Sequence, residues 1–427
     1  MTIASLRARL RRWAALGGAL AALLAGTQAH ALPSFARQTG MECAACHIGA
    51  FGPQLTPAGI RFKLGGYTDS DGKDGHVPIS AMVVSSFSRT QADQAAPPAG
   101  FKPNNNVALD EASLFLAGKL ADHVGTFIQL THDGVEHANA LDHVDIRYAR
   151  TVELAGKDTV LGLTVNNNPG VQDPFNTLPA WGAPFASSPF GEGTGGVASL
   201  LNGGLEHRVL GASGYVFFND RLYGELGTYR SLSPSTQDHL GAGTDLQKLG
   251  GNTYWRLGWL GDQKSQAYHL GVFGWNASLL PDRTVGGPYN RYRDIGIDGG
   301  YQLLGTREHV LTLDGSLLKE RMTDGTTLAR KHTTESRLSL AYNFRQTWGA
   351  SAGLFSTRGN DPLLPTRGQV FQVDWTPWGK EGASAPAPLG WTNLRLGAQY
   401  WRYDKFEGST VGARDHNTLY LFAWLSF

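Results

Sequence analysis

The only two cysteines of the chain stand close together, and a histidine follows the second one: Cys43-Ala44-Ala45-Cys46-His47. In this spacing two thiols can add to the two vinyl groups of one porphyrin, while the next residue offers an imidazole to the iron. The sequence therefore predicts one covalent haem c, held by Cys43 and Cys46 with His47 as proximal ligand. A simple disulfide and a thioredoxin-type redox pair are the alternatives, since both also use two close cysteines.

The distal ligand of such a haem is not fixed by the motif. Met41 lies too near Cys43 to wrap round the porphyrin plane. His76 and Met82 are the next candidates, since no other His or Met stands between His47 and residue 107, where the second of the strands predicted below begins. A Met ligand suits electron transfer at a raised potential. Met82, however, falls within the first predicted strand, residues 80–90, and the alternative is that its side chain faces lipid.

A second group of residues could bind a metal ion. Carboxylate and imidazole together suit Fe(II), and both occur in the second long connection predicted below. We predict Glu136 and His137 as an encounter site for Fe(II), with solvation of an exposed loop as the alternative. The group consists of His132, Asp133, Glu136, His137, Asp142, His143 and Asp145.

The N-terminus has the form of an export signal. Four arginines precede an apolar stretch over residues 14–26, and Ala29-His30-Ala31 supplies small residues for cleavage. We expect residues 1–31 to be a signal peptide, with an uncleaved anchor as the alternative. Removing them lowers the formal charge from +1 to −3, which does not indicate a nucleic-acid partner.

The segment that carries the haem motif, residues 32–79, is small. A chain of this length buries too little apolar surface without a covalent staple. We expect turns, at most one short helix near residues 57–64, and apolar contacts with the rest of the protein. Its own apolar residues are Phe51, Leu55, Ile60, Phe62, Leu64 and Tyr67.

Beyond residue 80, apolar residues recur at every second position, the period of a β-strand. Glycine is abundant, with 55 residues, and charged residues make up only 17%, while no apolar run after the leader reaches the length of a membrane helix. The pattern predicts sixteen strands, near residues 80–90, 107–118, 123–132, 142–152, 158–167, 206–218, 220–230, 252–261, 266–277, 290–303, 307–320, 332–345, 347–358, 367–377, 391–404 and 414–427.

The predicted connections alternate between short turns and longer loops, as in outer-membrane barrels. The stretch Gly379 to Gly390 breaks this rule, because it should be short. The last strand alternates and ends in Phe427, with residues 419, 421, 423, 425 and 427 expected to face lipid. Tyr420, Phe422 and Trp424 on its other face either pack on the haem segment inside the barrel or belong to an interfacial girdle.

The longest predicted connection, residues 168–205, contains a proline at every fifth position. We expect it to fold into the pore over the haem, with a surface lid as the alternative. The prolines are Pro169, Pro174, Pro179, Pro184 and Pro189, and the aromatic residues between them are Phe175, Trp181, Phe185 and Phe190.

Residues on both sides of the motif carry a family resemblance. Phe35-Ala36-Arg37-Gln38-Thr39-Gly40 precedes the cysteines, and Leu55-Thr56-Pro57, Gly59 and Phe62-Lys63-Leu64-x-Gly66-Tyr67 follow them. With sixteen predicted strands, the chain resembles the fused monohaem c-type cytochrome–porins of bacterial outer membranes, including the iron-oxidising outer-membrane cytochromes. The motif match covers about residues 33–67, and the remainder shares length, strand pattern and the terminal Phe.

The resemblance implies an all-β fold, a 16-stranded antiparallel transmembrane β-barrel in outer-membrane lipid, with a c-type cytochrome segment at residues 32–79 and the barrel at 80–427. It implies electron transfer through one haem c, from extracellular Fe(II) to a periplasmic c-type cytochrome or other acceptor, which is an iron:cytochrome c oxidoreductase activity. The rival functions are a diffusion porin with an accessory periplasmic haem segment, and a haem peroxidase or gas sensor.

Overall fold

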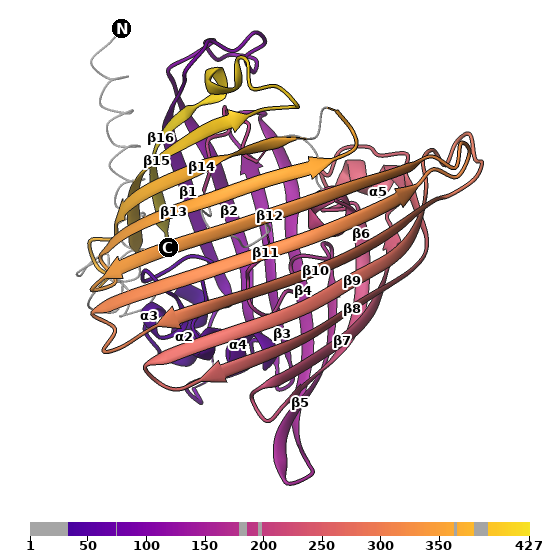
Figure 1. Cartoon of the computed structure of the whole chain (residues 1–427). Helices are drawn as coiled ribbons and strands as arrows, with labels where there is room; N and C mark the ends of the chain where they lie inside the picture. Colours follow the sequence, from indigo (N-terminus) through magenta and orange to yellow (C-terminus); the bar gives the residue numbers. More distant parts are fainter. Residues whose placement is uncertain (1–32, 74, 179–185, 195–198, 363–364, 380–391) are drawn as a thin grey trace, which may run out of the picture.

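The computed structural model describes residues 33–427 except 74, 179–185, 195–198, 363–364 and 380–391. The expected signal peptide and nearly all of the stretch from Gly379 to Gly390 lie outside the described residues. In the described part, sixteen antiparallel strands form one closed barrel in which each strand pairs with its neighbours in sequence and β1 pairs with β16 (Figure 1). The predicted 16-stranded all-β barrel is confirmed.

Each predicted strand overlaps an observed one. The strands are β1 (Ile79–Thr90), β2 (Asn106–Ala121), β3 (Val124–Asp133), β4 (Ala138–Leu154), β5 (Lys157–Asn166), β6 (Val209–Phe218), β7 (Leu222–Ser231), β8 (Lys248–Asp262), β9 (Gln266–Leu280), β10 (Asn290–Leu303), β11 (His309–Thr323), β12 (Arg330–Phe344), β13 (Trp348–Gly359), β14 (Thr366–Trp375), β15 (Asn393–Lys405) and β16 (Thr418–Ser426).

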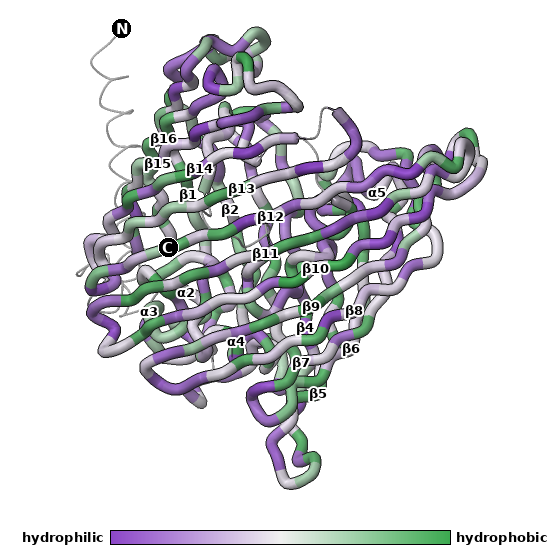
Figure 2. The backbone as a smooth tube through the Cα atoms, in the orientation of Figure 1, coloured by the Kyte–Doolittle hydropathy of each residue, from purple (hydrophilic) through white to green (hydrophobic). Residues whose placement is uncertain are grey.

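The apolar face of the strands points outward. In β12, Leu338 and Leu340 are 47% and 45% exposed, whereas Ala341 and Asn343 are buried on the inner face. The same alternation exposes Leu421 of β16 and buries Tyr420. Figure 2 shows hydrophobic residues along the strands. An apolar exterior around a polar lumen is the reverse of a soluble barrel and is typical of a barrel in lipid.

Aromatic and basic residues border this outer apolar surface at opposite ends. Near the short turns, Trp348 stacks on Trp375 with ring centroids 5.8 Å apart, and Trp259 lies 4.9 Å from Tyr268. At the long-connection ends of β10 to β12, basic residues are exposed on the outward face of paired strands. They are Arg291, Arg293, Lys319, Arg321 and Arg330.

Short turns and longer connections alternate as predicted, with one correction. We expected residues 133–141 to form a long second connection, but β3 and β4 continue beyond the predicted strands and meet in a turn of four residues, 134–137. A β-bulge opposite residues 128–130 lets β4 extend in this way. The residues expected on a loop therefore lie mostly on strands.

Residues 33–67 fold inside the barrel at the short-turn end (Figure 1). They form α2 (Pro33–Thr39), α3 (Cys43–Cys46) and α4 (Pro57–Leu64), so the expectation of at most one helix was wrong. Residues 33–67 are called the lumenal segment below. No helix in the described residues is long and apolar enough to cross a membrane.

The longer connections carry three further short helical pieces. The connection between β5 and β6, residues 167–208, is called the inner loop and contains η1 (Leu200–Gly204). The β7–β8 connection contains α5 (Pro234–His239), and the β15–β16 connection contains η2 (Ala413–His416).

Candidate functional site

The two cysteines begin and end α3, one helical turn apart. Residues at i and i+3 share a helix face, so both thiols are presented on the same side. Cys43 is 3% exposed and packs with Ala36 and Ala50. Cys43 and Cys46 are not joined in a disulfide. His47 ends α3 with extended dihedral angles, and its N–H donates to the Cys43 carbonyl at 2.8 Å.

Helix α4 holds α3 in place through two residues. The Thr56 hydroxyl donates to the Ala45 carbonyl at 2.7 Å and also caps α4 by accepting from the Gly59 N–H. A Cβ on Gly59 would lie 2.4 Å from the Cys46 carbonyl oxygen. Glycine is therefore required for this close helix contact.

Arg395 of β15 fixes the chain that follows His47. Its guanidinium donates to the carbonyls of Gly49 at 2.7 Å and Phe51 at 2.5 Å, and it lies 4.8 Å from the centre of the Phe51 ring. Phe51 also packs against Trp424 of β16 with ring centroids 5.1 Å apart. The haem motif is thus held from the barrel wall.

Of the three inward aromatic residues of β16, Trp424 packs on the lumenal segment, whereas Tyr420 and Phe422 make other contacts. Trp424 packs on Phe51, as expected for a lumenal contact. Tyr420 and Phe422 instead stack on each other with centroids 5.2 Å apart, and Tyr420 donates to Asp110 of β2 at 2.8 Å. Of the two expected arrangements, packing on residues 32–79 is therefore present for Trp424.

Lys63 joins the lumenal segment to the inner loop. Its ammonium donates to the carbonyls of Val171 and Asp173 at 2.8 and 2.7 Å and to Asn176 Oδ1 at 2.8 Å. Burial lowers the pKa of Lys63 to about 7. The Asp173 carboxylate in turn contacts Arg256 of β8 at 3.0 Å, both side chains being fully buried.

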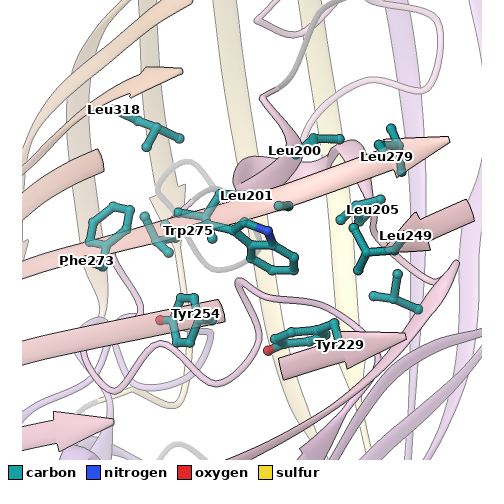
Figure 3. Packing of buried hydrophobic residues seen from close by; sticks show 13 residues of the cluster. Leu200, Leu201, Leu205, Tyr229, Leu249, Tyr254, Phe273, Trp275, Leu279 and Leu318 are labelled. Atoms are coloured by element: carbon teal, nitrogen blue, oxygen red, sulfur yellow. The ribbon is translucent and has the colours of Figure 1, made fainter. Parts of the chain in front are cut away.

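The inner loop lies against the inner wall, which confirms the prediction that it enters the pore. Leu200, Leu201 and Leu205 pack with wall residues such as Trp275 (Figure 3). Phe175 packs with residues of the lumenal segment and of β6 to β8. That cluster consists of Leu55, Ile60, Leu64, Phe175, Tyr215, Phe217, Tyr223 and Leu260. Pro179, Pro184, Trp181 and Phe185 lie outside the described residues.

Tyr67 anchors the end of the lumenal segment to β4. Its hydroxyl donates to Asp145 Oδ2 at 2.7 Å, and Arg147 Nε donates to the same oxygen at 2.8 Å. Thr164 of β5 donates to Asp145 Oδ1 at 2.8 Å. Asp145, which we counted with the second metal-binding group, is instead a buried structural acceptor.

The residues around the motif fit a covalent haem. Both thiols come from one helical turn, and small side chains flank Cys43. His47 Nδ1 is buried without a hydrogen-bond partner in the described structure, a costly state that a ligand can relieve. Burial lowers the pKa of His47 to about 4; a backbone hydrogen bond with Gly52 opposes this shift, and the Arg395 charge adds to it. The imidazole is therefore neutral, the form that binds metals.

The two candidate distal residues lie in different surroundings. His76 Nε2 is 2.8 Å from Asp71 Oδ1, on the chain leading to β1. Met82 is half-buried and lies on the same face of β1 as buried Ser80 and Val84. The alternative that Met82 faces lipid was therefore wrong. The role of either residue as a haem ligand stays a prediction.

The second predicted metal-binding group is divided by the structure. Glu136 and His137 are exposed in the β3–β4 turn. Asp142 and His143 lie on the β4 bulge and meet His207, the residue near the end of the inner loop. We call Asp142, His143 and His207 the Asp–His cluster. Glu136 and His137 do not belong to it.

Sequence reasoning missed the residues that hold these sites together. Arg395 and Arg147 look like any polar residue of a barrel lumen, and Lys63 was quoted only as part of the resemblance, so no local pattern identifies their contacts. His207 stands 64 positions after His143, and only the folded inner loop brings the two together.

Comparison with known proteins concerns the fold alone. No protein-family model and no curated protein matches the sequence. Three similar solved structures are OprB of Pseudomonas putida (12% identity, TM-score 0.49, covering 82% of this chain and 94% of that chain), the outer membrane channel DcaP of Acinetobacter baumannii (9%, 0.47, 82% and 96%) and an anion-selective porin from Comamonas acidovorans (10%, 0.45, 82% and 98%). These similarities give no ground for transferring a function.

Proposed function

We propose that the chain spans the bacterial outer membrane and transfers electrons across it through one covalent haem c, from extracellular Fe(II) to a periplasmic c-type cytochrome. Cys43 and Cys46 would attach the porphyrin and His47 would bind its iron. When bound, this group supplies a one-electron iron couple. The observation that carries the proposal is the fixed position of the haem motif inside a closed barrel.

The barrel surface supports the membrane placement. The exposed apolar face would contact lipid, and the Trp and Tyr pairs at the short-turn end match an aromatic girdle. The outward arginines and lysine at the other end would meet anionic headgroups, since basic side chains bind such surfaces. With the lumenal segment and Phe427 at the short-turn end, that end would face the periplasm.

The position of the lumenal segment favours transfer of electrons over diffusion of solutes. Its contacts reach much of the wall, because Ser34 meets Ser80 of β1, Gln54 donates to Asp314 of β11 and Arg61 meets Asp262 of β8. The inner loop covers it from the other side through Lys63. Both pieces occupy lumen through which a solute would otherwise pass.

Diffusion of solutes is the second candidate function. A closed barrel of sixteen strands is the size that leaves an aqueous channel in porins. Under this alternative the haem motif would be an accessory. Ion conductance in planar bilayers separates the two: a conductance like that of open porins supports diffusion, and a much lower one supports the proposed conduit.

The direct test uses liposomes that contain the protein and enclose a c-type cytochrome. Fe(II) supplied only outside should reduce the enclosed cytochrome, and the rate should vanish in His47→Ala. Haem staining after denaturing electrophoresis should be lost in the Cys43→Ala/Cys46→Ala double variant. Undiminished staining in this variant would contradict covalent attachment of haem to Cys43 and Cys46. If other donors but not Fe(II) reduce the enclosed cytochrome, the result would support electron transfer across the membrane and contradict Fe(II) as the donor.

The absorption spectrum tests the remaining alternative. A peroxidase or gas sensor needs an open position on the iron, so the reduced protein should change its spectrum with carbon monoxide. An electron-transfer site with two protein ligands should show no such change.

A further inference from the structure

The Asp–His cluster brings three metal-binding side chains to one point of the inner wall. Asp142 Oδ1 lies 2.8 Å from His207 Nε2 and 3.8 Å from His143 Nδ1. All three ligand atoms lie within 4.8 Å of one another. The two imidazole rings have centroids 5.9 Å apart and do not stack, since their planes are inclined by 60°.

This donor set suits a first-row divalent metal ion. Two imidazoles and one carboxylate form the ligand set of many Fe(II) sites, and imidazole also suits Zn²⁺ and Co²⁺. Metal–nitrogen and metal–oxygen bonds measure about 2.0–2.2 Å, so two ligand atoms on one ion are separated by roughly 3–3.5 Å. The distances of 2.8 and 3.8 Å bracket this separation.

Neighbouring residues hold the three side chains in place. The Thr131 hydroxyl donates to Asp142 Oδ2 at 3.1 Å, which leaves Oδ1 directed at the imidazoles. The Asn167 side chain donates to the Asp142 carbonyl at 2.7 Å and accepts from the Val144 N–H at 2.8 Å. The Asn167 carbonyl accepts from the His207 N–H at 3.2 Å. Asn167 therefore ties the β4 bulge to the inner loop, as outer-shell residues orient metal ligands.

The cluster is reachable and lies near the lumenal segment. The side chains of His143, Asp142 and His207 are 12%, 23% and 24% exposed. Asp145, which binds Tyr67, follows Asp142 by three residues on β4, a separation of about 10 Å along a strand. The cluster stands at the long-connection end, the side that the proposed function makes extracellular.

We propose that Asp142, His143 and His207 bind one divalent transition-metal ion on the inner wall of the barrel. Glu206, whose carboxylate lies 3.6 Å from His207 Nε2, adds negative charge beside it. Binding itself does not depend on haem. The further statement that the ion is the Fe(II) donor rests on the proposed function.

Co(II) binding to the full-length protein in detergent tests the site, because the visible absorption of Co(II) reports its ligands. The wild-type chain should bind one Co(II) that His207→Gln and His143→Gln each weaken by at least about tenfold. The matched control is His239→Gln, which removes an exposed His at the end of α5 in the β7–β8 connection and should bind Co(II) as the wild type does.

Three results would overturn the site. They are absence of Co(II) binding to the wild type, unchanged affinity in both His143→Gln and His207→Gln, and loss of binding in the His239→Gln control. Each variant is first checked for a folded barrel by its migration without heating, and Asp142→Asn serves if His207→Gln does not fold. The Cys43→Ala/Cys46→Ala chain should still bind Co(II), so failure of the haem proposal and failure of the metal site give different results.

Discussion

Arg395 is the residue whose loss should most directly release the haem motif from the barrel. It donates to the carbonyls of Gly49 and Phe51 and is 4% exposed. Arg395→Met keeps an unbranched side chain beside Phe51 but removes both charge-assisted hydrogen bonds. Each contributes about 1.5–3 kcal/mol, so docking should weaken by roughly 3–6 kcal/mol. Since 1.4 kcal/mol is a factor of ten, the undocked population should rise by about 10² to 10⁴.

Maleimide labelling of Cys43 measures this population. The thiol is 3% exposed when docked, so labelling in haem-free Cys46→Ala protein requires opening, and its rate follows the open fraction. Arg395→Met should speed it about a hundredfold or more. Arg402→Met is the matched control, because Arg402 lies on the same strand with a 45% exposed side chain and should leave the rate unchanged. Equal rates in wild type and Arg395→Met, with the barrel folded, would refute the anchoring role.

Three further outcomes are expected. Gly59→Ala would place a Cβ 2.4 Å from the Cys46 carbonyl oxygen and should destabilise the lumenal segment by about 1–3 kcal/mol in chemical denaturation, whereas Gly251→Ala, with nothing within 4 Å, should not. Burial lowers the pKa of Lys63 to about 7, below its roughly 10.4 when unfolded. The folded chain then binds fewer protons between these values, so resistance to proteolysis should rise from about pH 7 to about pH 9, and Lys63→Met should abolish the trend. Unheated protein should migrate faster than boiled protein, and removing Phe427 should lower the folded fraction, while identical migration would contradict a closed barrel.

The strands were predictable because their signal is local. Alternation of apolar and polar residues, as in Leu338 to Asn343, reports a face of the sheet without knowledge of its partners. The haem motif can be proposed from the sequence for the same reason, since all its chemistry lies within five residues, but haem binding stays a prediction. The extent of β3 and β4 was not, because the bulge at residues 142–143 interrupts the period on which the prediction depends.

The sites depend on contacts between distant residues, which no local pattern contains. Tyr67 meets Asp145 and Lys63 meets Asp173 only because the lumenal segment enters the barrel and the inner loop folds onto it. His207 joins Asp142 by the same folding of the inner loop. From the sequence alone, a polar residue on an inward face cannot be distinguished from a residue that only lines the lumen.

The closed ring also sets an order of events in the making of this protein. The last seam joins β1 to β16, where Ala81 and Phe427 exchange backbone hydrogen bonds of 2.7 and 2.9 Å, so the ring closes only when the final residues have arrived. The segment inside it immediately precedes β1, and its Cys43 thiol is sealed from solvent once docked. Under the proposed function, an enzyme that joins a porphyrin to that thiol would therefore act earlier, on the still open chain. Attachment of the porphyrin would come first, and closure of the barrel would then enclose it.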